Sequence, residues 1–442
     1  AQFMRDASRD LSDCRQAFTL LSTTRVFGLV RVFDDREVEI EQTIETADHL
    51  GWQAERYDAL LDQYEPDLTT ARCEVFFDGL RKAVVPLLEK IVASPVQADR
   101  KLFRGAAFPE AGQRDLGIAV TRALGFDYDA GRLDVSTHPF TNGFCTGDVR
   151  LTTRYDAQAP FQSLMGTIHE AGHGMYDQGL APEHEGTPLG DSVSLGIHES
   201  QSRMWENCVG RSRAFWRFFY PILQQTFHHQ LRALDGEQFY AAINRVKPSL
   251  IRVEADELTY NLHIMLRLEL EIAMVEGKVA VKDLPELWNT KMKEYLGMTP
   301  PNDAKGVLQD IHWSGGMLGY FSTYALGNLI SVQLWDRFLE FDPELEDQIR
   351  KGDFSALLSW LRVKIHQYGR KYEPQELVQR VTKSKIDSAP YVRYLNKNRT
   401  ALHAPFQVAK QINGSQIEVA IQYTDGYGES VHTFANNINT VD

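Results

Sequence analysis

Residues 167–179 read TIHEAGHGMYDQG and place two histidines four positions apart, with a glutamate directly after the first. Positions i and i+4 of an α-helix lie about 40° apart around the axis, so His169 and His173 would project side by side and could both bind one Zn²⁺ ion. Glu170 would lie beside the metal and could take a proton from water without being a ligand. The alternative is a histidine pair on a polar helix face, because HExxH arises by chance in roughly 5% of chains of this composition.

A catalytic zinc site needs a third protein ligand and one open position for water. The segment HESQSRMWEN follows at residues 198–207, and Glu199 could supply that ligand from a helix packed against the first. His198 is a competing candidate for the same role. The other interpretation of Glu199 is an ordinary i,i+4 ion pair with Arg203 on a helix surface.

Outward from the HExxH stretch, helical periodicity covers most of the chain. The stretch 148–155, DVRLTTRY, instead alternates in polarity and predicts a short strand, and residues 415–437 predict a β-hairpin around a turn at 424–429. The sequence therefore predicts a mainly α protein. Amphipathic helical patterns recur at residues 37–50, 70–92, 111–124, 160–179, 193–209, 212–233, 254–276, 317–340 and 354–367.

The composition argues against several classes of partner. Sixty acidic and 47 basic side chains give a formal charge of −13 over 442 residues, which would repel phosphate backbones and anionic lipid surfaces, so we expect no nucleic-acid and no membrane partner. The uncharged run at 313–335 could span a bilayer by length, but its polar residues and glycines favour a buried helix. The four cysteines are far apart and form no CxxC pair, so we expect a cytoplasmic protein without a disulfide framework.

Two later segments gather further polar side chains. GVLQDIHW at 306–313 carries Gln309, Asp310 and His312 just before the uncharged helix, and its plain alternative is a loop before a core helix. IRVEADELTYNLHIMLR at 251–267 has a charged stripe that is either a solvated face or, because apolar residues cover the other faces, the lining of a cavity. The residues of that stripe are Arg252, Asp256, Tyr260, His263 and Arg267.

Taken together, these segments resemble the carboxypeptidase Taq family of metallocarboxypeptidases over about residues 30–397. Six motifs in one order make the resemblance specific. It implies a mainly α body with a deep active-site groove, similar in architecture to neurolysin, thimet oligopeptidase and angiotensin-converting enzyme, with a small β-sheet near the metal and a homodimeric assembly. The motifs are HPF at 138–140, DVRLT at 148–152, HEAGH at 169–173, HESQ at 198–201, IRVEAD at 251–256 and GVLQDIHW at 306–313.

By motif match, the resemblance implies that His169, His173 and Glu199 bind Zn²⁺, with Co²⁺ as a possible substitute, and that Glu170 is the catalytic base. Arg252 occupies the position of the family arginine that pairs with the terminal carboxylate of the substrate. The chemistry agrees, because a fixed guanidinium can hold a carboxylate through two hydrogen bonds, and only a free C-terminus offers that group.

The remaining assignments concern the oxyanion and the substrate. Tyr324 is the first choice for a hydrogen-bond donor to the tetrahedral oxyanion, and Tyr320 and His312 are the next candidates for the same role. The strand DVRLT at 148–152, expected at an edge, could add backbone hydrogen bonds to an extended peptide. Four other residues either contact substrate or support the site from behind: His138, Arg150, Gln309 and Asp310.

Two departures from the family pattern shape the expected domains. HExxH lies closer to the start than in full-length relatives and residues 1–30 match poorly, so 1–397 is expected to be a helical metallocarboxypeptidase domain that lacks the opening helices. Residues 398–442 resemble the start of the transducer domain of the type II topoisomerase B subunit, such as DNA gyrase. No ATP site accompanies them, so we interpret this tail with its β-hairpin as extraneous, from a fusion or a joined reading frame.

The expected function is zinc-dependent removal of C-terminal residues, with broad specificity, from peptides that have a free C-terminus. Glu170 would promote attack of water on a carbonyl polarised by the metal. The alternatives are an endo-oligopeptidase with the same HExxH and glutamate site, and an inactive truncated remnant.

Overall fold

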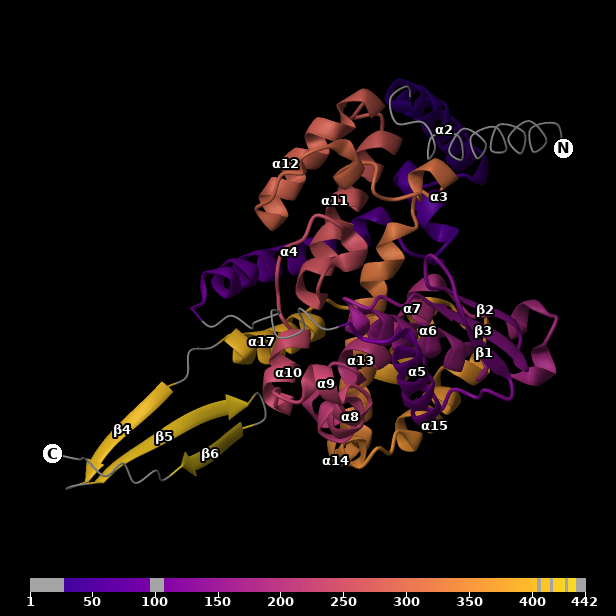
Figure 1. Ribbon diagram of the computed structural model, residues 1–442. Coiled ribbons are helices and arrows are strands. Elements are labelled where there is room, and N and C mark those ends of the chain that lie inside the picture. The colour runs from indigo at the N-terminus through magenta and orange to yellow at the C-terminus, as the bar shows by residue number, and fades with distance from the viewer. Residues whose placement is uncertain (1–27, 96–106, 404–406, 414–415, 426–427, 435–442) are drawn as a thin grey trace.

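The computed structural model describes residues 28–95, 107–403, 407–413, 416–425 and 428–434. Helices dominate this part of the chain, as predicted (Figure 1). The helices are α2 (Gly28–Leu50), α3 (Arg56–Asp62), α4 (Thr70–Ala93), α5 (Glu110–Leu124), α6 (Pro160–Asp177), α7 (Leu195–Arg203), α8 (Arg213–Thr226), α9 (His228–Leu231), α10 (Gly236–Ile243), α11 (Glu257–Val275), α12 (Leu284–Leu296), α13 (Phe321–Phe341), α14 (Leu345–Arg350), α15 (Ser355–Lys364), α16 (Pro374–Thr382) and α17 (Ala389–His403).

A small sheet lies beside α6, and its strand order corrects one prediction. It consists of β1 (Gly131–Val135), β2 (Thr141–Cys145) and β3 (Asp148–Thr153) in the order β1-β3-β2. β3 contains DVRLT and pairs with β1 in parallel and with β2 in antiparallel fashion. Both of its edges are therefore occupied, so the prediction that DVRLT is an edge strand is wrong, and β2 is the edge that lies against α6.

The nine-residue helix α7 is packed between α6 and α13, and glycines make this possible. A Cβ atom on Gly172 of α6 would lie 2.6 Å from Cα of Ser202 in α7. On the other side, a Cβ atom on Gly327 of α13 would overlap Cγ of Glu199. Because real Cβ atoms do not approach so closely, both helices can come this near to α7 only through glycine. The close packing brings Glu199 to the histidine face of α6.

A second sheet follows α17. β4 (Gln407–Asn413), β5 (Gln416–Asp425) and β6 (Gly428–Phe434) pair in antiparallel order. The predicted hairpin is confirmed as β5–β6, and β4 was not predicted. Figure 1 shows this sheet beyond α17, to one side of the helical body. The predicted domain boundary at 397/398 falls inside α17.

The uncharged run at 313–335 forms the short 3-10 turn η8 (Trp313–Gly315) and much of α13. Most of α13 is buried among other helices, as predicted for a core helix. Within the described ranges, no helix combines enough length and apolar character to cross a lipid bilayer.

Candidate active site

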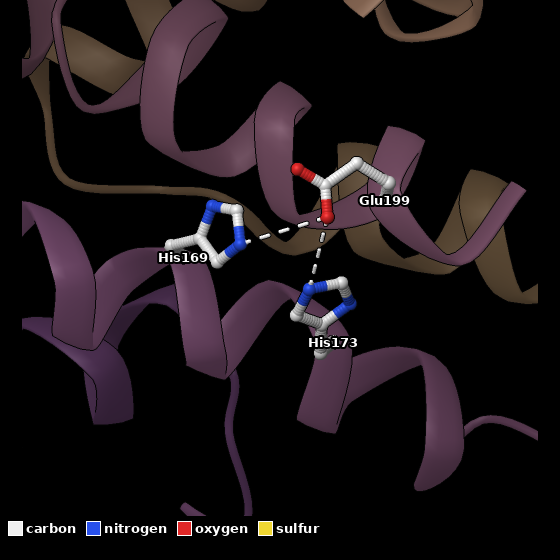
Figure 2. A group of neighbouring side chains, drawn as sticks. All are labelled: His169, His173 and Glu199. Carbon is white, nitrogen blue, oxygen red and sulfur yellow. Dashed lines mark ion pairs between the residues drawn. The ribbon is translucent and has the colours of Figure 1, made fainter. Parts of the chain in front are cut away.

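Two imidazoles of α6 and one carboxylate of α7 converge on a common point (Figure 2). Oε2 of Glu199 lies 3.8 Å from Nε2 of His169 and 3.5 Å from Nε2 of His173, and all three ligand atoms lie within 4.8 Å of one another. Tetrahedral ligands at about 2.1 Å from a zinc ion would be separated by about 3.4 Å. The donor set and its spacing therefore fit a divalent transition metal.

The two oxygens of Glu199 have separate partners. Oε1 accepts a hydrogen bond from Nε of Arg203 at 2.7 Å, while Oε2 faces the histidines. The ion pair with Arg203 that the sequence allowed is therefore present, and it leaves Oε2 facing the two histidines, where a metal ligand would lie. Burial alone would raise the pKa of Glu199, but Arg203 and His169 hold that pKa well below its usual range. The carboxylate is consequently ionised and able to act as a ligand at neutral pH.

A carboxylate that was not predicted orients His169. Oε2 of Glu206 lies 3.0 Å from Nδ1 of His169, so Nδ1–H can donate to it and leave Nε2 free for a metal. Glu206 lies in the π-helical turn η4 (Met204–Val209) that continues α7, and it also pairs with Arg203 and Arg211. A signal existed in the sequence, because Glu206 follows Glu199 by about two helical turns.

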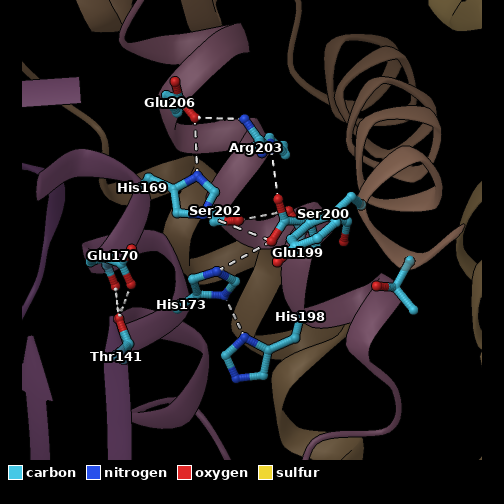
Figure 3. A network of polar contacts seen from close by, with 12 residues as sticks. Thr141, His169, Glu170, His173, His198, Glu199, Ser200, Ser202, Arg203 and Glu206 are labelled. Atoms are coloured by element: carbon cyan, nitrogen blue, oxygen red, sulfur yellow. Dashed lines mark hydrogen bonds and ion pairs between the residues drawn. The ribbon is translucent and has the colours of Figure 1, made fainter. Parts of the chain in front are cut away.

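His198 contacts Nδ1 of His173, the ring nitrogen that does not face Glu199 (Figure 3). The two Nδ1 atoms are 2.5 Å apart, and Nε2 of His198 lies 2.9 Å from Oδ1 of Asp177. When both imidazoles are neutral, these contacts are satisfied if Nδ1–H of His173 donates to His198 and Nε2–H of His198 donates to Asp177. Nε2 of His173 then keeps its lone pair for a metal. Asp177, one turn after His173 on α6, was not predicted.

Thr141 of the edge strand β2 holds the predicted base. Its hydroxyl lies 2.7 Å from Oε2 of Glu170 and 2.9 Å from the backbone oxygen of the same residue (Figure 3). Glu170 is buried beside the two histidines that flank it on α6. The contact fixes the carboxylate next to the three candidate ligands, where a general base would have to lie.

A second polar cluster is built around Asp310. Its Oδ1 accepts hydrogen bonds from Nε and Nη2 of Arg252 at 3.0 and 2.9 Å, and its Oδ2 accepts one from Nε of Arg267 at 2.6 Å. Nη1 of Arg252 donates to the hydroxyl of Tyr260 at 3.0 Å. Arg252 is 5% exposed and Arg267 is fully buried, so this part of the 251–267 stripe is not a solvated face.

Among its own members, this cluster holds more positive than negative charge. Two guanidinium groups face a single carboxylate, Asp310, whose pKa is held below its usual range by the two arginines against the effect of burial. Burial and Arg252 lower the pKa of His312 to about 4, so His312 is neutral at pH 7. A buried net charge is costly unless an anion compensates it. The cluster is therefore suited to receive one carboxylate.

Tyrosines connect the two clusters. The guanidinium of Arg203, which holds Glu199, lies 4.3 Å from the ring centre of Tyr260. The ring centre of Tyr324 lies 4.9 Å from the guanidinium carbon of Arg252, and the hydroxyl oxygen of Tyr324 lies 3.3 Å from Nε2 of His312. Burial raises the pKa of Tyr324 well above its usual value, so its hydroxyl stays protonated and can donate.

The other predicted residues are placed less centrally. Gln309 accepts from the backbone N–H of Arg252 at 2.9 Å, so it supports that arginine. Tyr320 packs edge to face against Tyr324, with ring centres 5.2 Å apart. Arg150 is exposed and paired with Asp148, and His138 is exposed and bonded to the adjacent Pro139. The last two contacts are local and give no direct support to a role in binding substrate.

An α-helix bearing HExxH, with a glutamate from the next helix facing both histidines, defines a metal-dependent peptidase. The family model described as Carboxypeptidase Taq (M32) metallopeptidase matches residues 3–399, and the chain belongs to this family. The match begins earlier than the residue 30 expected from the motifs. The chain is therefore a metallocarboxypeptidase, and the endo-oligopeptidase alternative is not favoured.

Individual relatives agree with the family assignment. The chain is 45% identical over 350 residues to thermostable carboxypeptidase 1 of Thermus thermophilus, covering 79% of this chain and 68% of the relative. It is 40% identical over 377 residues to carboxypeptidase 1 of Bacillus subtilis, covering 85% and 75%. The crystal structure of the M32 carboxypeptidase from Deinococcus radiodurans R1 has a TM-score of 0.88 at 37% identity, covering 92% of this chain and 81% of that one.

The C-terminal part matches a different family. The family model for DNA gyrase B matches residues 388–442. The DNA gyrase B protein of Myxococcus xanthus is 45% identical over 51 residues, which is 11% of this chain and 6% of the relative. The predicted resemblance of the tail is thus confirmed, and its match overlaps the end of the carboxypeptidase match within α17.

Substitution of Gly327 by alanine is expected to weaken metal binding about tenfold, because the new methyl group overlaps Cγ of Glu199 and must displace it. Chelator competition measures the affinity. Gly166→Ala on α6 is the matched control, since its Cβ would meet nothing closer than 4.0 Å. Equal affinities for the two variants would contradict the packing argument.

His312→Asn is expected to reduce the loss of stability in acid. The pKa of His312 is about 4 in the folded protein, against an ordinary value of 6.5, so the stability linked to its neutral form is present above pH 6.5 and is lost as pH falls through 4. That difference is worth about 3 kcal/mol. Denaturant unfolding of metal-free protein at pH 7.5 and 4 measures it. The exposed His229→Asn control should behave like wild type, and an unchanged pH dependence in His312→Asn would refute the assignment.

Proposed function

We propose that this metallocarboxypeptidase is zinc-dependent and removes single C-terminal residues, with broad specificity, from peptides that have a free C-terminus. The observation that carries the proposal is the convergence of His169, His173 and Glu199 within 4.8 Å. Two neutral imidazoles and one carboxylate suit Zn²⁺, and Co²⁺ accepts the same donors. A zinc ion held there would act as a Lewis acid toward water and toward the scissile carbonyl.

The side chains of the protein would perform the proton transfer and stabilise charge. Glu170, fixed by Thr141, would take the proton from the attacking water and later deliver it to the leaving amine. Tyr324, kept protonated by burial, would donate a hydrogen bond to the oxyanion, with Tyr320 and His312 as its neighbours.

Arg252 would bind the terminal carboxylate of the peptide. A guanidinium has five N–H donors, and three of them are used by Asp310 and Tyr260. One hydrogen on each terminal nitrogen is thus left for a ligand. Asp310 and Tyr260 hold the guanidinium in place, and the surplus positive charge of the cluster, to which Arg267 contributes, supplies the electrostatic attraction.

A peptide and its C-terminally amidated twin test this assignment. We expect kcat/KM to fall about 100-fold on amidation, because a charge-assisted pair worth about 3 kcal/mol is lost. In Arg252→Lys the discrimination should shrink, since a lysine cannot form the paired hydrogen bonds. Equal cleavage of both peptides by the wild-type chain would remove Arg252 from this role and favour endopeptidase action.

We also propose domain bounds, a cellular location and an oligomeric state. We place the catalytic domain at residues 1–397 and assign no catalytic role to 398–442. A cytoplasmic location is supported by Cys73, Cys145 and Cys208, which are free thiols in the described part of the chain. Homodimerisation rests on the family resemblance, and sedimentation equilibrium would test it. Roles for His138 and Arg150 in substrate binding stay predictions, as does the use of the β2 edge by an extended peptide.

A further inference from the structure

The turn after α3 holds the first turn of α7, the helix that carries Glu199. The backbone oxygen of Tyr64 accepts from N–H of Leu195 at 3.3 Å, and Oε2 of Glu65 accepts from N–H of Gly196 at 3.0 Å. Glu65 is fully buried, and a Cβ atom on Gly196 would lie 2.6 Å from its Oε2. One backbone carbonyl and one buried carboxyl group thus each accept from a backbone N–H that the start of a helix leaves unpaired.

The same segment also holds the loop before α13. The hydroxyl of Tyr57 donates to Oε2 of Glu271 at 2.5 Å, and Glu271 accepts in addition from Nε1 of Trp313 at 2.6 Å and N–H of Gly319 at 3.0 Å. Gly319 has a φ of 94°, and a Cβ atom there would lie 2.7 Å from the backbone oxygen of Leu60. The loop therefore packs directly on the backbone of α3.

A ring contact completes the connection. The rings of Tyr64 and Tyr320 meet edge to face at 5.4 Å between centres. Tyr320 immediately precedes α13 and packs in turn against Tyr324 and His312, with ring centres 5.2 and 5.3 Å apart. Residues 57–65 thus contact two elements of the site. They hold the start of α7 through the side chain of Glu65, and they contact the loop before α13 through tyrosine side chains and backbone.

We propose that residues 57–65 form a positioning brace, which sets the location of Glu199 relative to Tyr320 and Tyr324; this inference rests on the function proposed for those three residues. α7 begins at Leu195, and the first N–H groups of a helix have no partner within it, so the start of α7 depends on contacts from outside the helix. Glu199 lies five residues after the N-cap Ser194, so a shift of the helix start is passed on to the ligand. Ligand geometry must be held to about 0.5 Å for tight binding and fast turnover.

Two variants on adjacent residues separate the two sides of the brace. Glu65→Ala removes the acceptor for Gly196 and is expected to weaken zinc binding about tenfold in chelator competition. Tyr64→Leu leaves the backbone carbonyl in place and removes the ring contact with Tyr320. It is expected to keep the zinc affinity and to lower kcat about tenfold at unchanged metal content. A merely structural role would not divide the two effects in this way.

Rescue and control variants make the test specific. Glu65→Gln keeps a carbonyl acceptor and should restore most of the zinc affinity. Should Glu65→Ala fail to fold, Gly196→Ala disturbs the same contact from the opposite side and should give the same loss. Gln333→Ala is the matched control, because this buried amide bridges α13 to residues 384–387 away from both segments. It should lower stability while leaving zinc affinity and kcat unchanged.

Wild-type zinc affinity in Glu65→Ala, or equal losses in Glu65→Ala and Gln333→Ala, would overturn the brace and leave the proposed function standing. A wild-type chain that binds no metal would overturn the proposed function and the brace together. A loss of zinc affinity confined to the Glu65 and Gly196 variants, with a loss of kcat in Tyr64→Leu, is the expected result.

Discussion

Glu170→Gln is expected to lower kcat/KM for a peptide with a free C-terminus at least about 1000-fold while leaving zinc affinity unchanged. The amide has nearly the same shape and can still accept a hydrogen bond from Thr141, but it cannot take a proton from water. Neither of its atoms belongs to the set of three converging ligand atoms. Steady-state kinetics combined with metal analysis of the same preparation measures both quantities.

A graded control accompanies this variant. Thr141→Val removes the hydroxyl that orients Glu170 and keeps the carboxylate, so its expected loss is about tenfold. If Glu170→Gln retained a tenth of the wild-type activity, Glu170 would not be the base. If the wild-type chain showed no hydrolysis, the result would instead favour the alternative of an inactive truncated remnant.

Glu199→Gln is expected to lower zinc affinity at least about 100-fold. Structural zinc sites contribute about 10–16 kcal/mol over four ligands, so one ligand is worth roughly 3 kcal/mol. The change also removes the carboxylate that pairs with Arg203, a partly buried cation that keeps Glu206 as its other ion-pair partner. The metal-free variant should therefore be less stable by about 3 kcal/mol. Chelator competition and denaturant unfolding measure the two effects.

Glu206→Gln distinguishes a ligand from an orienting group. Glu206 contacts His169 on the nitrogen that faces away from the shared point, so its loss should cost only about 10- to 100-fold in zinc affinity. A larger loss for Glu206→Gln than for Glu199→Gln would show that the two roles have been exchanged.

The convergence of His169, His173 and Glu199 could be predicted in large part because two of the three residues are neighbours on one helix. The i,i+4 spacing of His169 and His173 fixes two ligands on any helix, and the motif order supplied Glu199. The role of His198 could not be predicted, because it depends on how α6 and α7 cross. That crossing is set by the contact of Gly172 with Ser202, which no periodicity reveals.

Contacts between segments that are distant in the sequence explain the other features that could not be predicted. The strand β3 was expected at an edge because β1, GRLDV, was not recognised as its parallel partner. The charged stripe at 251–267 was recognised, but its pairing with Asp310 spans 58 positions for Arg252 and 43 for Arg267. Short-range patterns carry no information about such pairs. The orienting role of Thr141 likewise arises only when β2 packs on α6.

Two imidazoles of α6 and a carboxylate of α7 should bind one metal ion. An anomalous difference map from a crystal grown with zinc, recorded on both sides of the zinc absorption edge, tests it most directly. We predict a single strong peak at about 2.0–2.2 Å from Nε2 of His169, Nε2 of His173 and Oε2 of Glu199. A map with no peak there, or a peak that Glu199 does not reach, would contradict the claim.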